Sequence, residues 1–235
     1  MATSLYRARP GAGFGKQGGK AAAATQRRGS TATKPLKRPS QARAKFTVQA
    51  IYDALVRIWR REGWAGVTTR AVALETGISV GTLYDYFPNK QALLSGYVRH
   101  CVEALLQAIE QQVIHPAELD WGERMDRLVR LSCGVDVPEQ PYFDAEMLAL
   151  EAQIAEPKHH RRAFEELSAQ WQRAIAACTD LPSPPDAGTV SALFACVWGG
   201  RRYLLMVQPR DVDLHAWVSR VQHICRAALG PPGGN

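Results

Sequence analysis

The chain has 235 residues, enough for one medium-sized or two small domains, and its 46% hydrophobic content is ordinary for a soluble globular protein. The formal net charge of +7 is unevenly spread, because ten of the 29 Lys and Arg residues and none of the 22 Asp and Glu residues lie in residues 1–44. The five cysteines lack metal-ligand spacing, and no apolar run approaches the roughly 18 residues of a membrane span, so we expect no metal, cofactor or membrane anchor.

Residues 1–40 are rich in Gly, Ala, Ser, Pro and basic residues and contain few large apolar side chains. Such a segment buries too little surface to offset the entropy lost on ordering, so we predict a disordered basic tail. Two roles for this tail stay open. Its charge either aids solubility alone or strengthens DNA binding by a neighbouring domain through counterion release.

The first predicted helix covers residues 40–62, and Gly63 is expected to end it. Lys45, near the polar start of this helix, is a candidate contact to a DNA backbone. The apolar residues recur with the helical period and share one face: Val48, Ile51, Ala54, Leu55, Ile58 and Trp59.

A pair of short helices is predicted next. Thr68 or Thr69 accepts the free N–H groups at the start of a helix over residues 70–76. Gly77 then supplies the positive φ that a tight turn after a helix requires, and Ile78 packs back on that turn.

Ser79 is the expected N-cap of the second short helix, which ends at Phe87 because Pro88 stops it. Two helices round a tight turn indicate a helix-turn-helix, whose second helix lies in the major groove of DNA. The same spacing also occurs in folds that never bind nucleic acid. The exposed residues of the second helix favour DNA, since they are small, hydroxyl-bearing or aromatic: Ser79, Val80, Gly81, Thr82, Tyr84, Asp85 and Tyr86.

Asn89 is expected to N-cap a helix that continues to Gln112 and belongs to both halves of the chain. Lys90 lies in its first turn, where a DNA phosphate is a suitable partner. The rest of the chain is predicted to be helical, which makes the fold all-α; the helices are expected over residues 119–133, 139–156, 158–178, 187–208 and 212–229.

The predicted helix over 187–208 is apolar on more than one side. A surface helix needs one apolar face, so a second face indicates burial against a partner. We therefore expect a homodimer through this helix and the last one, 212–229, with two recognition helices presented to a palindromic site.

Residues 48–98 closely resemble the DNA-binding domain of TetR-family transcriptional regulators. Two positions depart from the family pattern: Val80 stands where a basic residue or proline is common, and Asp85 stands where His or Tyr is common. The matching segments are Ile51–Leu55, Gly63–Trp64, Thr68–Arg70, Gly77–Ser79, Gly81–Tyr84, Phe87–Lys90 and Leu93–Leu94.

The resemblance implies an N-terminal three-helix helix-turn-helix domain over 41–92 and a C-terminal bundle over 93–230 for effector binding and dimerisation. It also implies a bacterial, cytoplasmic regulator of double-stranded DNA, most often a repressor that a small-molecule effector releases from a palindromic operator. The residues expected to bind DNA are Lys45, Thr69, Arg70, Ser79, Val80, Gly81, Thr82, Tyr84, Asp85, Tyr86 and Lys90.

Aromatic and methionine residues of the C-terminal half fit two interpretations. They either fill the core or line an effector cavity between facing helices, which is where TetR-like regulators hold their effectors. The candidate ligand-binding residues are Tyr97, Met125, Phe143, Met147, Phe164, Trp171, Trp198 and Arg202.

Two other classes of protein stay open. One is a ligand-free architectural or nucleoid-associated protein that uses the basic tail to bind DNA broadly. The other is an enzyme with an attached DNA-binding domain. The sequence has no nucleophile elbow, phosphate loop or zinc signature, and His159 and His160 point about 100° apart on a helix, so we expect neither catalysis nor a metal site.

Overall fold

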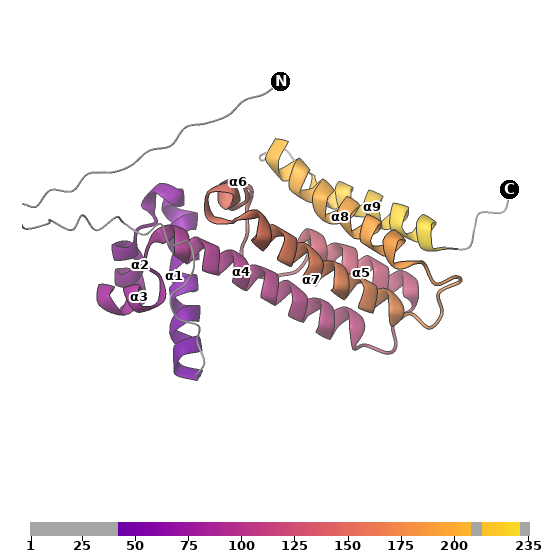
Figure 1. The fold of residues 1–235 in the computed structure, drawn as a ribbon, viewed down its shortest axis with the longest axis horizontal. Helices are drawn as coiled ribbons and strands as arrows, with labels where there is room; N and C mark the ends of the chain where they lie inside the picture. The colour runs from indigo at the N-terminus through magenta and orange to yellow at the C-terminus, as the bar shows by residue number, and fades with distance from the viewer. Residues whose placement is uncertain (1–41, 208–212, 231–235) are drawn as a thin grey trace, which may run out of the picture. The chain divides into compact units, whose positions relative to one another are not determined.

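The computed structural model describes residues 42–207 and 213–230. These residues form nine α-helices and one π-helical turn, with no strand among them, which confirms the all-α prediction (Figure 1). The predicted tail over residues 1–40 lies outside the described residues, as does the segment 208–212, so the tail stays a prediction.

Three helices form the N-terminal part: α1 (Ala42–Gly66), α2 (Thr69–Thr76) and α3 (Val80–Tyr86). Gly63, at a φ of 66°, interrupts α1 at the position where the sequence predicted its end. Gly77 adopts φ 76° and closes α2 through its backbone N–H, as expected of a left-handed C-cap.

The caps of the two short helices follow the predicted side-chain chemistry. Thr68, rather than Thr69, accepts the backbone N–H of Ala71 at 3.0 Å. Ser79 accepts the N–H of Thr82 at 3.0 Å. These caps satisfy N–H groups that have no partner inside the first turn, and they fix where α2 and α3 begin.

Helix α4 (Lys90–Ile109) connects the two hydrophobic cores of the described chain. Its first half contributes Leu93, Leu94 and Tyr97 to the N-terminal core, which α1–α3 and α6 (Ala145–Ile154) complete. Its second half contributes Leu105 and Ile109 to the bundle core. Helix α4 is therefore packed into the cores of both halves.

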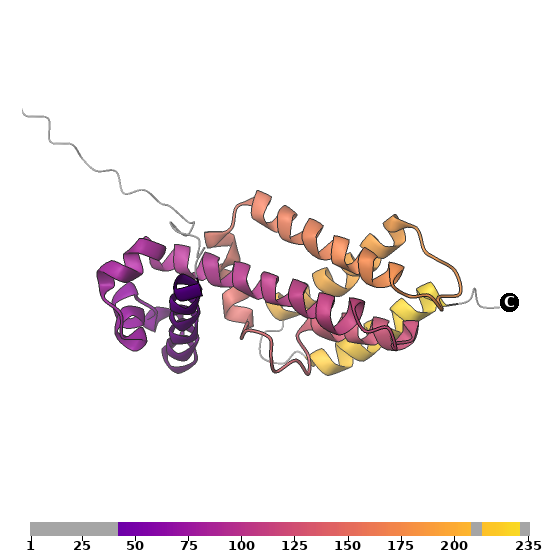
Figure 2. The same ribbon diagram turned by 90° about the horizontal axis from the view of Figure 1, so that it is seen from below.

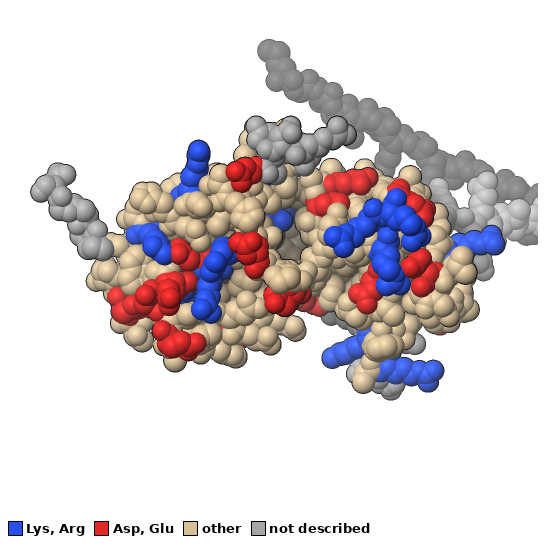
Figure 3. Space-filling view, turned by 180° about the vertical axis from the view of Figure 1, so that it is seen from behind, with Lys and Arg blue, Asp and Glu red and all other residues tan. Residues whose placement is uncertain are grey.

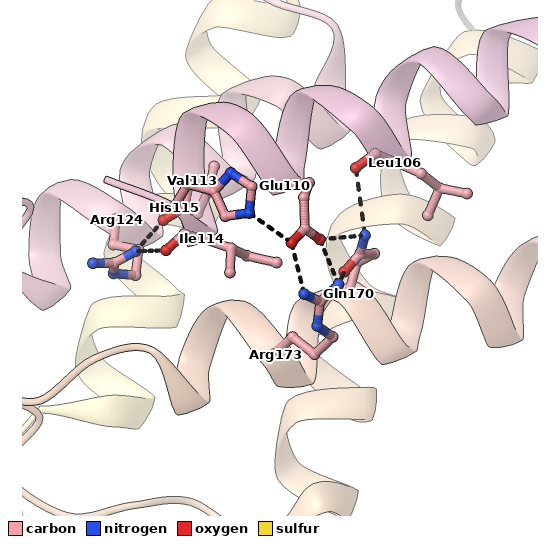
Figure 4. Close-up of polar contacts among 8 residues, drawn as sticks. All are labelled: Leu106, Glu110, Val113, Ile114, His115, Arg124, Gln170 and Arg173. Atoms are coloured by element: carbon pink, nitrogen blue, oxygen red, sulfur yellow. Dashed lines mark hydrogen bonds and ion pairs between the residues drawn. The ribbon is translucent and has the colours of Figure 1, made fainter. Parts of the chain in front are cut away.

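The α-helical part of α4 ends earlier than predicted. It stops at Ile109 and continues as the π-helical turn η1 (Glu110–Ile114), whereas the sequence indicated an α-helix to Gln112. The buried guanidinium of Arg124 donates to the carbonyl oxygens of Val113 and Ile114 in this turn (Figure 4). The last carbonyl groups of the helix thus accept hydrogen bonds from a side chain of another helix. The period of apolar residues does not predict such bonds, so the sequence did not indicate the π-helical turn.

The C-terminal bundle adds four helices to α4 and α6. Helices α4 and α7 lie side by side in both ribbon views, and α5 packs against α9 (Figures 1 and 2). Helix α6 starts at Ala145 instead of the predicted residue 139, because Asp144 is its N-cap. The four are α5 (Trp121–Cys133), α7 (Pro157–Ala176), α8 (Ala187–Val207) and α9 (Leu214–Leu229).

Helix α8 is long and apolar enough to cross a membrane by length and composition alone, and it is the one such helix in the described ranges. It packs against α5, α6, α7 and α9 and contributes Val190, Phe194 and Val197 to the bundle core. These contacts are those of a bundle helix with one buried face and one exposed apolar face.

Candidate nucleic-acid interface and effector cavity

Helix α3 presents a small, mixed surface. Val80 is 39% exposed and Tyr84 45% exposed, and Gly81 and Asp85 are also exposed, while Leu83 is buried. The residues predicted to bind DNA therefore share the outward side of α3, with Thr82 and Tyr86 half-buried at its edges. A short helix with small side chains in its first turn approaches base edges closely.

Two hydroxyl pairs lie beside this surface. The Ser79 and Thr82 hydroxyl oxygens are 2.8 Å apart, and those of Thr69 and Tyr84 are 3.2 Å apart. The second pair joins α2 to α3, and Arg70 is exposed in the first turn of α2. Hydroxyl and guanidinium groups in this arrangement suit the oxygen atoms of a DNA backbone.

Lys90 is held at the start of α4. Its ammonium lies 4.1 Å from the centre of the Trp64 ring and 3.5 Å from the Trp64 carbonyl oxygen, to which it donates. The cation–π contact orients the ammonium while leaving it N–H groups for an anion. Lys45 lies elsewhere: it is exposed in the first turn of α1 and lines the larger of two cavities described next.

Two neighbouring cavities are lined by α4, α6 and α8, and the larger also reaches α1. The space-filling view shows a hollow on one face between the N-terminal helices and the bundle (Figure 3). The smaller has a volume of about 260 Å³ and is formed by α4, α5, α6, α8 and the loop before α6. Three residues predicted from the sequence are among its aromatic and charged lining: Phe143, Trp198 and Arg202.

The larger cavity has a volume of about 1200 Å³ and is bounded by α1, α4, α6, α7 and α8. Phe164, another predicted ligand residue, lines it, and Trp198 and Arg202 line both cavities. The two cavities also share Val98, Val102 and Glu151, so five side chains form their common wall.

The other predicted ligand residues are packed into cores and line neither cavity. Tyr97 is 2% exposed and donates its hydroxyl to the Tyr142 carbonyl at 2.6 Å. Trp171 is fully buried and donates its indole N–H to the Ser132 hydroxyl at 3.0 Å. Filled space around such groups leaves no room for a ligand. The set that we remove from the candidate cavity is Tyr97, Met125, Met147 and Trp171.

Charge in the smaller cavity comes from three side chains. Arg202 Nη2 donates to Glu151 Oε2 at 2.6 Å, and His160 lies 3.8 Å from the same oxygen. Arg201 is 9% exposed and donates its Nε–H to the Cys133 carbonyl at 2.8 Å. Burial lowers the pKa of Arg201 below its usual value.

Metal-binding geometry does not occur in the described part of the chain, where no three His, Cys, Asp or Glu side chains converge. The backbone N–H of Glu156 donates to Nδ1 of His159 at 3.1 Å, so His159 is part of the cap of α7.

Comparison with known proteins links the N-terminal part to a family. Residues 51–96 match the sequence model of the bacterial regulatory proteins of the tetR family. The chain is also similar to the nucleoid occlusion factor SlmA of Marinomonas sp. (strain MWYL1), with 25% identity over 187 residues that cover 74% of this chain and 92% of that protein.

Solved structures share the fold at low identity. A Mesorhizobium loti protein described as a TetR-family transcriptional regulator is 17% identical, with a TM-score of 0.58 over 80% of this chain and 98% of its own. SmeT, the repressor of the Stenotrophomonas maltophilia multidrug efflux pump SmeDEF, is 19% identical, with a TM-score of 0.55 over 79% of this chain and 91% of its own. SmeT has also been solved in a complex with triclosan.

Proposed function

We propose that this chain, a DNA-binding transcriptional regulator of the TetR family, is a homodimeric repressor that leaves a palindromic operator when a small molecule binds. The proposal places it in the bacterial cytoplasm and assigns it no catalytic step. The observation that carries it is the outward surface of α3, where exposed Val80, Tyr84 and Asp85 follow a Ser79 cap.

The DNA contacts divide into two groups under this proposal. Hydroxyl and basic side chains hold phosphates, and Val80 and the Tyr86 ring offer apolar surface to thymine methyl groups. Asp85 repels phosphate and accepts a hydrogen bond from a base amino group such as cytosine N4. The proposed phosphate contacts are Lys45, Arg70, Ser79, Thr82, Tyr84 and Lys90, and the proposed base-proximal residues are Thr69, Val80, Gly81, Asp85 and Tyr86.

Dimerisation is proposed through α8 and α9. Tyr203 is 66% exposed and Met206 64% exposed on α8, and Ile224 is 54% exposed on α9. Exposed small residues at Ala192, Cys196 and Gly199 continue the α8 face with a spacing of three and four residues. Such a face buries apolar surface well against its two-fold copy, and the resulting four-helix contact presents two α3 helices to one DNA duplex.

Effector control is proposed to act through α4. Val98, Cys101, Val102 and Leu105 of this helix line the smaller cavity, and its first half packs in the core of the DNA-binding helices. A ligand that binds one position of α4 more tightly than another shifts the spacing of the two DNA-binding heads. The SmeT complex with triclosan supports the fold as a holder of small molecules.

The test is selection of bound sequences from random DNA, with the full chain and with a chain that starts at Ser40. A palindromic motif from both supports the repressor proposal and reduces the tail to an aid to affinity. The repressor proposal is contradicted when no motif is enriched and when the chain without the tail loses DNA binding at moderate salt.

A second candidate function is favoured by the similarity to the nucleoid occlusion factor SlmA. Under this alternative the chain is a nucleoid-associated protein that binds DNA without needing an effector. The same selection separates the two, because weak discrimination between selected and random DNA supports the nucleoid-associated alternative.

A further inference from the structure

We propose that the effector is a small organic acid whose carboxylate binds the guanidinium of Arg201 in the smaller cavity. This inference rests on the proposed function, because it takes that cavity as the effector site. It adds the chemical class of the ligand and the residue that recognises it.

Arg201 is a buried cation whose one hydrogen-bond partner in the described residues is an uncharged carbonyl group. It is 9% exposed, and its Nε–H donates to the Cys133 carbonyl at 2.8 Å. In the part of the chain that the structure describes, no Asp or Glu forms an ion pair with it. A buried arginine without a counterion is unfavourable, and its other four N–H groups form a planar fork that suits a two-oxygen anion.

The position of this fork favours the cavity as the place where the anion binds. Arg201 and Gly134 both line the cavity, and Nη2 of Arg201 lies 3.6 Å from where a Cβ of Gly134 would stand. A residue without a side chain thus lies beside the guanidinium. Burial lowers the pKa of Arg201, as expected for a cation that is largely shielded from solvent.

The neighbouring charges leave Arg201 uncompensated. Arg202 and Glu151 pair with each other at 2.6 Å, so the charged residues lining the cavity carry one net positive charge. Ser132, which also lines the cavity, accepts the Trp171 indole N–H at 3.0 Å. Its own hydroxyl proton has no acceptor among residues 42–207 and 213–230, so it is available to the anion.

A single carboxylate matches this site better than a phosphate monoester. Its one negative charge balances one positive charge, whereas a dianion would leave excess charge among apolar walls. The hydrocarbon part of the ligand faces a mainly apolar lining from four elements: Val98, Val102, Leu105, Leu131, Val137, Phe143 and Trp198.

The volume limits the size of the acid. At about 30 Å³ for each water-sized group, 260 Å³ holds a ligand of about nine non-hydrogen atoms. Benzoate, 3-phenylpropionate and octanoate are of this size and differ in the shape of their hydrocarbon part, so we choose them as probes.

The experiment measures binding of these three acids and of their three amides to the full chain by isothermal titration calorimetry. Each amide keeps the shape of its acid and removes the charge. We expect at least one acid to bind about tenfold or more tightly than its amide. The proposal is overturned when no acid binds, or when every amide binds as tightly as its acid.

Variants assign the preference to one residue. Arg201→Gln is expected to abolish the difference between acid and amide, and Arg201→Lys to retain part of it, because the charge stays and the fork is lost. Arg173→Gln is the matched control, since this exposed arginine on α7 lines neither cavity. An unchanged acid preference in folded Arg201→Gln contradicts the proposal. Should Arg201→Gln fail to fold, the comparison of acid with amide on the unaltered chain decides.

Failure of this inference and failure of the proposed function give different results. Binding to a selected palindrome, without any preference for acids over amides, supports the proposed regulator and contradicts the proposed carboxylate ligand. A preference for acids that depends on Arg201, without sequence-selective DNA binding, supports the carboxylate site and contradicts the proposed repressor function.

Discussion

Trp59 donates its indole N–H to the Asp144 carboxylate at 2.9 Å, and this bond joins the longest DNA-binding helix, α1, to the start of α6. The same Asp144 oxygen accepts the Tyr142 hydroxyl at 2.9 Å, and the other oxygen caps α6 through the Met147 N–H at 2.8 Å. Tyr142 lines the smaller cavity. One carboxylate therefore connects a cavity wall to the DNA-binding domain, in addition to the connection through α4.

The Trp59–Asp144 bond predicts the behaviour of Trp59→Phe. Losing this hydrogen bond should cost about 1 kcal/mol, or a fall in Tm of roughly 2–4 °C, and raise the effector concentration for half-release of DNA several-fold. Thermal unfolding and gel-shift titration measure the two effects. Trp121→Phe, on α5 and outside this junction, is the control. An unchanged effector dose would show that α4 alone carries the coupling.

The DNA-facing residues predict two kinds of variant. Lys90→Ala and Tyr84→Phe should weaken binding to every sequence, Lys90→Ala by about tenfold with a salt slope smaller by about one. Val80→Ala should instead change preference at one base position, because only base edges distinguish sequences. Gel shifts on matched and mutated operators measure both. Equal effects of the three variants on every site would contradict this division.

Local side-chain chemistry made the helix-turn-helix predictable. The caps at Thr68, Ser79 and Asn89 and the turn at Gly77 depend on residues within three positions of each other. Such interactions are written in adjacent sequence, so the prediction placed the helix starts to within one residue.

The cavity was less predictable because it depends on contacts between distant residues. Arg201 meets the Cys133 carbonyl 68 positions away, and Trp59 meets Asp144 85 positions away. The periodic spacing of aromatic residues is the same whether neighbouring side chains fill the space beside them or leave a cavity. The sequence therefore could not tell which of Trp171 and Trp198 lines a cavity. In the structure Trp171 is fully buried and Trp198 lines both cavities.

The buried Arg124 predicts a large effect on stability. It is 3% exposed and donates to the carbonyl oxygens of Val113 and Ile114 (Figure 4). It also donates to those of Pro116 and Leu119. Arg124→Met leaves these acceptors without a donor, so we expect a loss of roughly 2–4 kcal/mol in the free energy of unfolding.

Urea denaturation measures the effect of Arg124→Met. Arg127→Met, three residues along α5 and half-buried, removes the same charge and should cost less than about 1 kcal/mol. Similar losses for both variants would contradict the role assigned to the carbonyl contacts.

Glu110 predicts a pH-dependent contribution to stability. It bonds Arg173 Nη2 at 2.7 Å and accepts from Gln170 at 3.2 Å, and His115 lies 3.1 Å away (Figure 4). The hydrogen bond from Arg173 lowers the pKa of Glu110. A lowered folded-state pKa stabilises the fold above the unfolded pKa, and this contribution disappears as the pH falls through the folded value.

Glu110→Gln should therefore lower Tm by about 1–2 °C at neutral pH, because the pair is near the surface. The difference should shrink as the pH falls below the ordinary glutamate pKa of about 4.3 and vanish at lower pH. Calorimetric scans from pH 7 to pH 3 measure it. A difference that grows towards acid pH would have the wrong sign for this account.

The cysteines predict a chemical test of the dimer face. Cys196 is exposed on α8, in the face that contains Tyr203, whereas burial raises the pKa of Cys133 to about 11 and that of Cys225 to about 12. Thiolate is the reactive form, so in the monomer iodoacetamide at pH 7 should modify Cys196 well before those two. Burial of Cys196 between two copies should slow its modification about tenfold or more.

Tyr203→Glu should break the proposed interface, because it places a charge in the apolar contact, and should restore rapid labelling of Cys196. Mass spectrometry over a time course measures the rate at each cysteine, and sedimentation measures the oligomeric state of both proteins. Cys178, which follows α7, lies outside α8 and α9 and should react at the same rate in both. Rapid labelling of Cys196 in a protein that sediments as a dimer would place the dimer contact on another face.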